Sequence, residues 1–263
     1  MNAAKSETVL ITGASSGIGL ELAKFFAADG CRLILLARNT EALEALAGEL
    51  RRTNKIETFV LTADLSRLET PALVFKELQS RAIAVDVLVN NAGFGAQGVF
   101  AGLPLKRQLE MIQVNITALT DLTGLFLPGM IERRRGGVLN VGSVAGFLPG
   151  PGMAVYYATK AHVLSFTEAL AEELAGTGLT ATALCPGPTT SNFGNIARGQ
   201  SVRRFKTGKM SAQTVARYGH KAFREGKVVA IPGWRNRAAT FLVRITPRAL
   251  VRKLVKSYNR TDE

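Results

Sequence analysis

The chain has 263 residues, of which 47% are hydrophobic and 20% are charged, and this length suits one large α/β domain with a substantial core. Its two cysteines, Cys31 and Cys185, lie in apolar runs, which is typical of buried thiols and excludes a disulfide framework; with only two histidines, we expect no metal site. We find no secretory signal and no run approaching the roughly 18–20 apolar residues of a membrane-spanning helix, so we expect a cytoplasmic protein.

The formal net charge of +13 is carried by the C-terminal quarter of the chain. Residues 1–197 hold 16 Lys and Arg against 17 Asp and Glu, whereas residues 198–263 hold 17 against 3. This asymmetry predicts an acidic partner or an acidic surface for the C-terminal segment.

Short β-rich runs alternate with longer helical patterns over the first two thirds of the chain. The expected strands cover residues 8–12, 32–37, 57–62, 86–90, 137–142, 179–185 and 228–232. The expected helices cover residues 17–28, 40–52, 67–82, 105–133 and 154–175, with Pro128 bending or ending part of the fourth. This alternation implies right-handed βαβ units and therefore an α/β fold with a doubly wound parallel sheet, a single Rossmann-fold domain. We assign this domain to residues 1–233 and a basic amphipathic extension to residues 234–263.

A glycine-rich turn joins the first expected strand to the first expected helix. It spaces its glycines as Gly-x-x-x-Gly-x-Gly, unlike the common Gly-x-Gly-x-x-Gly fingerprint. Glycines here allow a tight turn and let the backbone approach a pyrophosphate, which the helix N-terminus attracts. An ordinary strand–helix turn is the alternative. We predict that the cofactor is bound by Gly13, Ser15, Ser16, Gly17, Ile18 and Gly19.

The end of the second expected strand carries information on the type of cofactor. The strand ends in Leu36-Ala37-Arg38-Asn39, without the acidic residue that selects NAD by binding its ribose 2′-hydroxyl. Arg38 could instead pair with a 2′-phosphate through a charge-assisted fork, or it could be a surface arginine that caps the strand. We favour the first interpretation and predict NADP(H).

Polar residues also follow the third and fourth expected strands. Asp64, followed by Leu65, could face the adenine amino group, could N-cap the helix over 67–82, or could do both. The sequence Asn90-Asn91-Ala92-Gly93 lies at the carboxyl edge of the sheet, where ligands bind, although such residues also make a plain turn. We predict that Asn91, Ala92 and Gly93 run beneath the cofactor.

Tyr156 and Lys160 have the i, i+4 spacing that places two side chains on one face of a helix. A phenol holds its proton until about pH 10, and an adjacent ammonium lowers that pKa, so we expect proton exchange near neutrality. The hydroxyl of Ser143 could hydrogen-bond the same substrate oxygen. The spacing is also that of an exposed helical pair. Tyr157 is a competing phenol, which we expect to pack at the helix edge.

These motifs together resemble the short-chain dehydrogenase/reductase family over nearly the whole chain. The resemblance rests on the glycine-rich turn, Asp64, Asn90–Gly93, Asn115, Ser143, Tyr156-x-x-x-Lys160 and Pro186-Gly187. It selects Tyr156 over Tyr157 and implies that Asn115, Ser143, Tyr156 and Lys160 carry catalysis. Within this set, Lys160 would also hold the nicotinamide ribose, and Asn115 would position a water in a proton relay.

The resemblance has further implications for binding and assembly. It places Pro186, Gly187 and Thr189 beside the nicotinamide and its carboxamide. It also implies a homodimer or homotetramer formed through the helices over 105–133 and 154–175.

The implied reaction is hydride transfer between NADP(H) and the carbonyl or alcohol of a small-molecule substrate. Residues 188–210 are interpreted as a mobile loop that could close over it. Apolar candidates for the substrate pocket favour a hydrophobic ketone or aldehyde, although each could be ordinary core: Phe94, Phe147, Leu148, Met153 and Phe193. A dinucleotide-binding regulator without turnover is the alternative, and the complete set of proton-transfer residues argues against it.

The C-terminal extension has the pattern of an amphipathic basic helix. Arg248, Arg252, Lys253 and Lys256 interleave with Leu250, Val251, Leu254, Val255 and Tyr258, and on a helix these separate into a basic face and an apolar face. The apolar face could pack on the body or on a partner subunit, or the helix could lie on anionic lipid as the main function of a peripheral membrane protein. We expect no nucleic-acid binding, because no aromatic-rich basic groove accompanies these charges.

Overall fold

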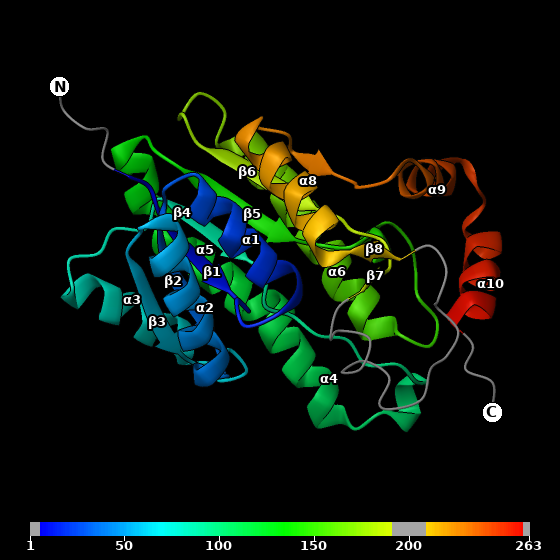
Figure 1. Cartoon of the computed structure of the whole chain (residues 1–263). Helices are drawn as coiled ribbons and strands as arrows, with labels where there is room; N and C mark the ends of the chain where they lie inside the picture. Colours follow the sequence, from blue (N-terminus) through cyan, green and yellow to red (C-terminus); the bar gives the residue numbers. More distant parts are fainter. Residues whose placement is uncertain (1–5, 191–208, 260–263) are drawn as a thin grey trace.

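The computed structural model describes residues 6–190 and 209–259 and shows a three-layer α/β fold (Figure 1). Within these residues, a seven-stranded sheet has the order β3-β2-β1-β4-β5-β6-β9, and every neighbouring pair is parallel. The expected doubly wound parallel sheet is therefore confirmed. Its strands are β1 (Thr8–Thr12), β2 (Arg32–Ala37), β3 (Thr58–Thr62), β4 (Val87–Asn90), β5 (Gly137–Val141), β6 (Thr180–Leu184) and β9 (Val229–Ala230).

Each face of the sheet is covered by its own set of helices. One core cluster joins the strands to α1 (Gly17–Ala28), α2 (Thr40–Asn54) and α8 (Ala212–Arg224). The cluster on the opposite face joins them to α3 (Thr70–Ser80), α5 (Ala118–Arg133) and α6 (Ala154–Glu173). Successive strand residues enter opposite clusters, as Val9 and Leu10 do, which explains why the strands are continuous apolar runs.

The helix expected over 105–133 is divided into three parts. It consists of α4 (Leu105–Ile112), a π-helical turn (Gln113–Thr117) and α5. The prediction that Pro128 would end part of it is wrong, because α5 continues through Pro128 to Arg133. Such π-bulges are frequent at functional sites, and this one carries Asn115.

The stretch Leu105–Arg133 is long and apolar enough, by length and composition, to cross a membrane, which the sequence analysis had not found. Here it is a core helix, because Leu122, Phe126 and Met130 pack beneath the sheet.

Two helices, and not one, form the C-terminal extension. They are α9 (Trp234–Ile245) and α10 (Arg248–Asn259), which lie at one end of the molecule (Figure 1). They separate at Thr246, which adopts an extended conformation because the following Pro247 disfavours a helical one. Val251 and Val255 of α10 are buried, so part of the apolar face packs on the body of the protein.

Candidate active site

The glycine-rich turn between β1 and α1 is closed against the segment that follows β4. The side-chain amide of Asn91 donates to the carbonyl oxygens of Thr12 and Gly13 at 2.9 and 3.1 Å. A Cβ at Gly19 would lie 2.4 Å from both that amide nitrogen and the Gly13 oxygen, so no larger residue fits there. Gly13 and Gly17 also adopt positive φ angles of 65° and 58°. The glycine spacing is therefore explained by contacts between two of the predicted motifs.

The residues at the N-terminus of α1 fit a dinucleotide phosphate. The N-cap residue, Ser16, makes no capping hydrogen bond with its side chain, so it does not satisfy the first N–H groups of the helix. Those N–H groups and the helix dipole favour an anion here. The structure places Ser15 and Ile18 in the same turn, as the sequence predicts.

Arg38 and Asp64 lie together at the ends of β2 and β3. Arg38 is exposed, and its neighbour Asn39 caps α2 by accepting a hydrogen bond from Ala42. Burial alone would raise the pKa of Asp64, but hydrogen bonds from Ser66 and the nearby charge of Arg38 outweigh it, so the pKa is lowered. The side chains of Arg38 and Asp64 are therefore close enough to contact one bound ligand.

One of the alternatives for Asp64 is wrong. The N-cap residue of α3 is Glu69, so Asp64 does not cap that helix. Its carboxylate instead accepts a hydrogen bond from the Ser66 backbone at 3.0 Å. The side chain of Leu65 is buried in the core, which leaves the main chain of Leu65 for contact with a cofactor.

The segment after β4 runs between the glycine-rich turn and the predicted catalytic residues. Thr12 Oγ1 accepts hydrogen bonds from the backbone of Asn91 and Ala92, both at 3.0 Å. A Cβ at Gly93 would lie 3.0 Å from Asn115 Oδ1 and 3.6 Å from Lys160 Nζ. Gly93 therefore lies directly against two members of the predicted catalytic set.

The structure brings Ser143, Tyr156 and Lys160 together. Ser143 follows β5, where its hydroxyl accepts a hydrogen bond from the Ala145 backbone at 3.1 Å and bonds with Tyr156. Lys160 Nζ lies 6.0 Å from the centre of the Tyr156 ring, one turn away on α6, and donates to the carbonyl of Val141 at 2.7 Å. A phenol, a hydroxyl and an amine therefore converge at the carboxyl edge of the sheet.

The pKa of Tyr156 differs from the sequence-based expectation. Burial raises it to about 12, and the hydrogen bond with Ser143 opposes this only in part. The expectation that Lys160 lowers the pKa of Tyr156 is therefore wrong for this structure, because the lysine amine donates its hydrogen bond to the Val141 carbonyl. Burial lowers the pKa of Lys160 to about 8. Lys160, and not Tyr156, is the group that titrates near neutrality.

Asn115 is buried on the π-helical turn and is held from both sides. Its amide nitrogen donates to the carbonyl of Phe94 and to Thr159 Oγ1, both at 3.0 Å, and its oxygen accepts from the Phe94 backbone at 3.1 Å. Thr159 in turn donates to the carbonyl of Tyr156 at 2.7 Å. The sequence analysis missed Thr159, although a polar residue on the buried face of a helix indicates a side chain that needs a hydrogen-bond partner.

The turn after β6 carries the other predicted nicotinamide residues. Thr189 donates to the Gly187 carbonyl at 2.9 Å, and the carbonyl of Pro186 lies 3.4 Å from Ser143 Oγ. A Cβ at Gly187 would lie 2.5 Å from the side chain of Asn236 on α9. The sequence analysis missed Asn236, because no local motif shows that α9 returns to this turn.

Comparisons with known proteins agree with this geometry. The family model described as short chain dehydrogenase matches residues 7–200. The chain belongs to this family. It is 40% identical to sulfoacetaldehyde reductase 2 of Chromohalobacter salexigens over 196 residues, which are 74% of this chain and 77% of that one. For several other curated relatives, the match covers only 53 to 62% of the relative's own length.

Solved structures of short-chain dehydrogenases have the same fold. One from Sphingobium yanoikuyae, in complex with NADPH, is 34% identical with a TM-score of 0.83 and covers 93% of this chain and 94% of its own. One from Burkholderia phymatum, in complex with NAD, is 26% identical with a TM-score of 0.80, covering 90% and 92%. Related proteins therefore bind either nicotinamide dinucleotide.

The predicted substrate-pocket residues of this short-chain dehydrogenase separate into three groups. Phe94 and Leu148 are half-buried near the site. The main chain of Phe94 is hydrogen-bonded to the side chain of Asn115 and its ring stacks on the Arg107 guanidinium at 3.9 Å, whereas Leu148 packs in the cluster that Tyr156 joins. Met153 is a core residue buried beneath α10, and Phe147 is half-buried and packs towards β6, away from the cluster that Tyr156 joins. Phe193 and most of the predicted loop over 188–210 lie outside the described residues.

Tyr157 is buried, and not at the helix edge as expected. It packs against Val251 and Val255 of α10, and its hydroxyl bonds to Asn259 at 3.3 Å. The C-terminal extension therefore covers the residue next to Tyr156, the predicted catalytic tyrosine.

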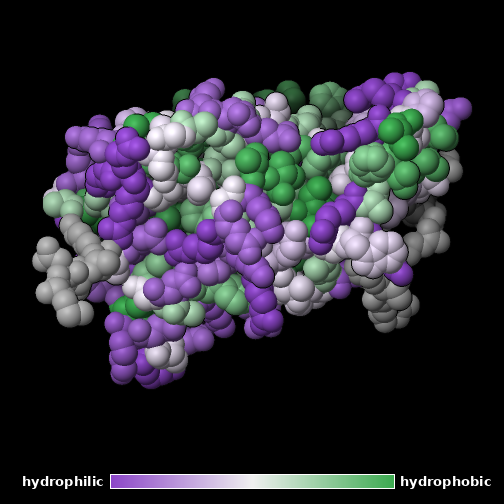
Figure 2. All heavy atoms as spheres, turned by 90° about the horizontal axis from the view of Figure 1, so that it is seen from above, coloured by the Kyte–Doolittle hydropathy of each residue, from purple (hydrophilic) through white to green (hydrophobic). Residues whose placement is uncertain are grey.

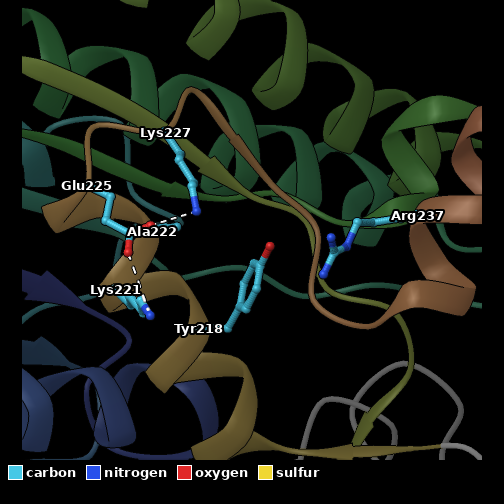
Figure 3. A pocket seen from close by; sticks show the side chains of 6 residues that line it. All are labelled: Tyr218, Lys221, Ala222, Glu225, Lys227 and Arg237. Carbon is cyan, nitrogen blue, oxygen red and sulfur yellow. Dashed lines mark ion pairs between the residues drawn. The ribbon is translucent and has the colours of Figure 1, made fainter.

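A surface hollow of about 270 Å³ lies apart from these residues, between α8 and the start of α9 (Figure 3). Its lining contains ion pairs from Glu225 to Lys221 and Lys227, together with Tyr218 and Arg237 (Figure 3). None of the predicted site residues lines this hollow. Among the described residues, no three His, Cys, Asp or Glu side chains form a group that could hold a metal ion.

Proposed function

We propose that this short-chain dehydrogenase transfers a hydride between NADP(H) and the carbonyl or alcohol of a hydrophobic small molecule. The observation that carries the proposal is that Ser143, Tyr156 and Lys160 come together, while Lys160 and Asn115 lie against Gly93. The segment that contains Gly93 is hydrogen-bonded to the glycine-rich turn. The nicotinamide, when bound, supplies or accepts the hydride.

The residues of the chain would handle the proton and the developing charge. Because its pKa is about 12, Tyr156 keeps its proton at neutral pH and can donate it to an alkoxide. Ser143 would hydrogen-bond the same oxygen. Lys160, with a pKa of about 8, can return a proton to the phenol, and Asn115 and Thr159 fix the segments around it.

The preference for NADP(H) is supported by Arg38. Its guanidinium is exposed at the end of β2, where no carboxylate precedes it to repel a 2′-phosphate. Asp64 lies close enough for the charge of Arg38 to help lower the pKa of its carboxyl, so Arg38 is the cation at this end of the site that could pair with the extra phosphate.

The substrate class is supported by the walls of the site, and the reaction type by one relative. Leu148 packs in the cluster that Tyr156 joins and offers apolar surface near the site, which suits a hydrophobic ketone or aldehyde; the ring of Phe94 lies against the guanidinium of Arg107. The related sulfoacetaldehyde reductase is named for reduction of a carbonyl compound, which supports the reaction type.

The test is a panel of carbonyl compounds assayed by NADPH absorbance, with NADH measured alongside. We expect turnover with apolar ketones or aldehydes and a higher kcat/KM with NADPH. A panel that gives no turnover, together with tight NADPH binding, would contradict the proposal and favour a dinucleotide-binding regulator.

We further propose that the enzyme is a homo-oligomer formed through α4, α5 and α6. Leu105 and Leu109 of α4 are 62% and 55% exposed, which leaves apolar surface for a second copy. Light scattering on the eluting protein would give the mass, and a monomer would contradict this assembly.

A further inference from the structure

The two C-terminal helices carry positive charge without any negative charge. From Trp234 to Asn259 the chain has seven Lys and Arg and no Asp or Glu. All seven basic side chains are exposed, and they are Arg235, Arg237, Arg244, Arg248, Arg252, Lys253 and Lys256. This surface can therefore attract an anionic partner over its whole length.

The same helices expose an unusual amount of apolar surface. Of the fifteen large hydrophobic side chains that are exposed in the described part of the chain, seven lie on α9 and α10. They are Trp234, Phe241, Leu242, Ile245, Leu250, Leu254 and Tyr258, with exposures from 49 to 72%. Figure 2 shows hydrophobic and hydrophilic side chains gathered side by side at this end of the molecule.

The exposed residues follow the helical period. On α10, Leu250, Leu254 and Tyr258 form a stripe at i, i+4 and i+8. The adjacent stripe, Val251 and Val255, is buried against the body. Within the described part of the chain, packing on the body buries the Val251 stripe of α10, whereas Leu250 and Leu254 remain exposed among the basic residues.

We propose that α9 and α10 form a contact surface for anionic lipid headgroups. Apolar and aromatic side chains among Lys and Arg, without carboxylates, are what a helix needs to lie in a bilayer interface. Trp234 and Tyr258 are the aromatic types that settle at headgroup depth. A second copy fits poorly, because a two-fold contact would face this basic surface with itself.

The position of α10 couples this surface to the proposed site. Asn259, at the end of α10, donates to the Pro151 carbonyl at 3.0 Å and bonds to Tyr157, and its main-chain oxygen accepts from Gln97 at 2.8 Å. A lipid surface at α10 would therefore lie beside the chain segments that flank Tyr156. If the proposed function holds, an apolar substrate could enter from the bilayer; the lipid contact itself does not depend on that function.

The test is sedimentation of the full chain with vesicles of phosphatidylcholine alone or mixed with phosphatidylglycerol. We expect sedimentation only with the anionic vesicles, falling as salt is raised. The variant Arg252→Gln/Lys253→Gln/Lys256→Gln should lower the partition coefficient roughly a hundredfold, because each basic residue near such a surface contributes about fivefold. The matched control, Arg52→Gln/Lys76→Gln/Lys106→Gln, changes three exposed basic residues elsewhere and should sediment like wild type.

A second pair of variants tests the apolar stripe. Ile245→Gln/Leu254→Gln should weaken vesicle binding, whereas Leu68→Gln/Leu73→Gln, exposed outside α9 and α10, should not. Equal sedimentation with both vesicle types, or none, would overturn the proposal, as would an Ile245→Gln/Leu254→Gln variant whose only effect is a lower oligomeric mass.

Turnover of a water-soluble carbonyl compound, measured on the same samples, keeps this result separate from the proposed function. Vesicle binding without turnover would contradict only the enzyme, and turnover without vesicle binding would contradict only the lipid surface.

Discussion

Tyr156 and Lys160 share a helix face, yet burial changes their pKa values in opposite directions. The pKa of the phenol rises to about 12 and that of the lysine falls to about 8. In both cases desolvation disfavours the charged form. The phenol is thereby kept as a proton donor, and the lysine is brought to a pKa at which it can exchange protons with water.

Replacement of Tyr156, the proposed proton donor, should separate cofactor binding from the chemical step. We expect Tyr156→Phe to lower kcat by a factor on the order of 10²–10⁴, which is the usual contribution of a general acid, with little change in the Kd for NADPH. Stopped-flow turnover and fluorescence titration would measure the two quantities. Tyr157→Phe is the matched control and should keep turnover, because that hydroxyl meets Asn259 and not the site. Near-wild-type turnover in Tyr156→Phe would contradict the assignment.

The pH dependence should follow Lys160. Below about pH 8 the lysine is protonated and can refill the phenol after each reduction; above it the proton is lost. We therefore expect kcat for carbonyl reduction to fall as pH rises through about 8, and alcohol oxidation, which must release a proton, to rise over the same range. Steady-state profiles in both directions would show this, and a flat reduction profile from pH 7 to 9 would contradict it.

Arg38 should set the cofactor preference. Because charge-assisted hydrogen bonds contribute about 1.5–3 kcal/mol, we expect Arg38→Gln to lower kcat/KM for NADPH by roughly ten- to a hundredfold while kcat/KM for NADH changes little. Arg67→Gln is the control, since Arg67 is also exposed and also lowers the pKa of Asp64. Equal use of both cofactors by the wild-type enzyme would refute the argument.

Among the secondary-structure elements, the alternation of apolar runs and helical patterns predicted the bounds of every strand of the large sheet to within one or two residues. It could not predict the π-helical turn at Gln113–Thr117, because that turn is held by Asn115 bonding to Phe94, a residue 21 positions earlier. The apolar face of α10 was predicted from the sequence, but which of its side chains are buried depends on Tyr157 and Met153, which no local pattern reveals.

The start of α1 offers a sharp test of its packing. A Cβ at Gly19 would lie 2.4 Å from the Gly13 carbonyl oxygen, which belongs to the backbone and cannot move away cheaply. We expect Gly19→Ala to lower the free energy of unfolding by about 1–3 kcal/mol or more and to weaken NADPH binding. Gly48→Ala in α2, where nothing lies within 4 Å, should instead stabilise the protein by up to about 1 kcal/mol. Chemical denaturation would measure both, and equal effects would contradict the close approach at Gly19.

For the whole molecule, the motifs predicted which residues meet at the carboxyl edge of the sheet, because parallel strands bring their ends together whatever the details of packing. They did not predict Thr159, Asn236 or Asn259, whose partners are set by how helices return to the site. Only long-range contacts bring Asn236 to Gly187 and Asn259 to Tyr157. The contacts that join α8 to the beginning of the chain are also long-range, and the motifs did not predict them.

Arg224 of α8 forms ion pairs that join this late helix to the first elements of the chain. Its guanidinium bonds to Glu7 at 2.6 Å and to Asp29 at 2.8–2.9 Å, which joins α8 to the segment before β1 and to the end of α1. The side chain is 30% exposed, so the charges are only partly screened. We expect Arg224→Gln to lower the free energy of unfolding by about 1–3 kcal/mol, since two carboxylates lose a charged partner. Lys227→Gln, which removes an exposed pair with Glu225, is the control and should leave stability unchanged within error. Urea denaturation of the three proteins would decide, and a loss in Lys227→Gln as large as that in Arg224→Gln would show that net charge, and not this contact, holds the ends together.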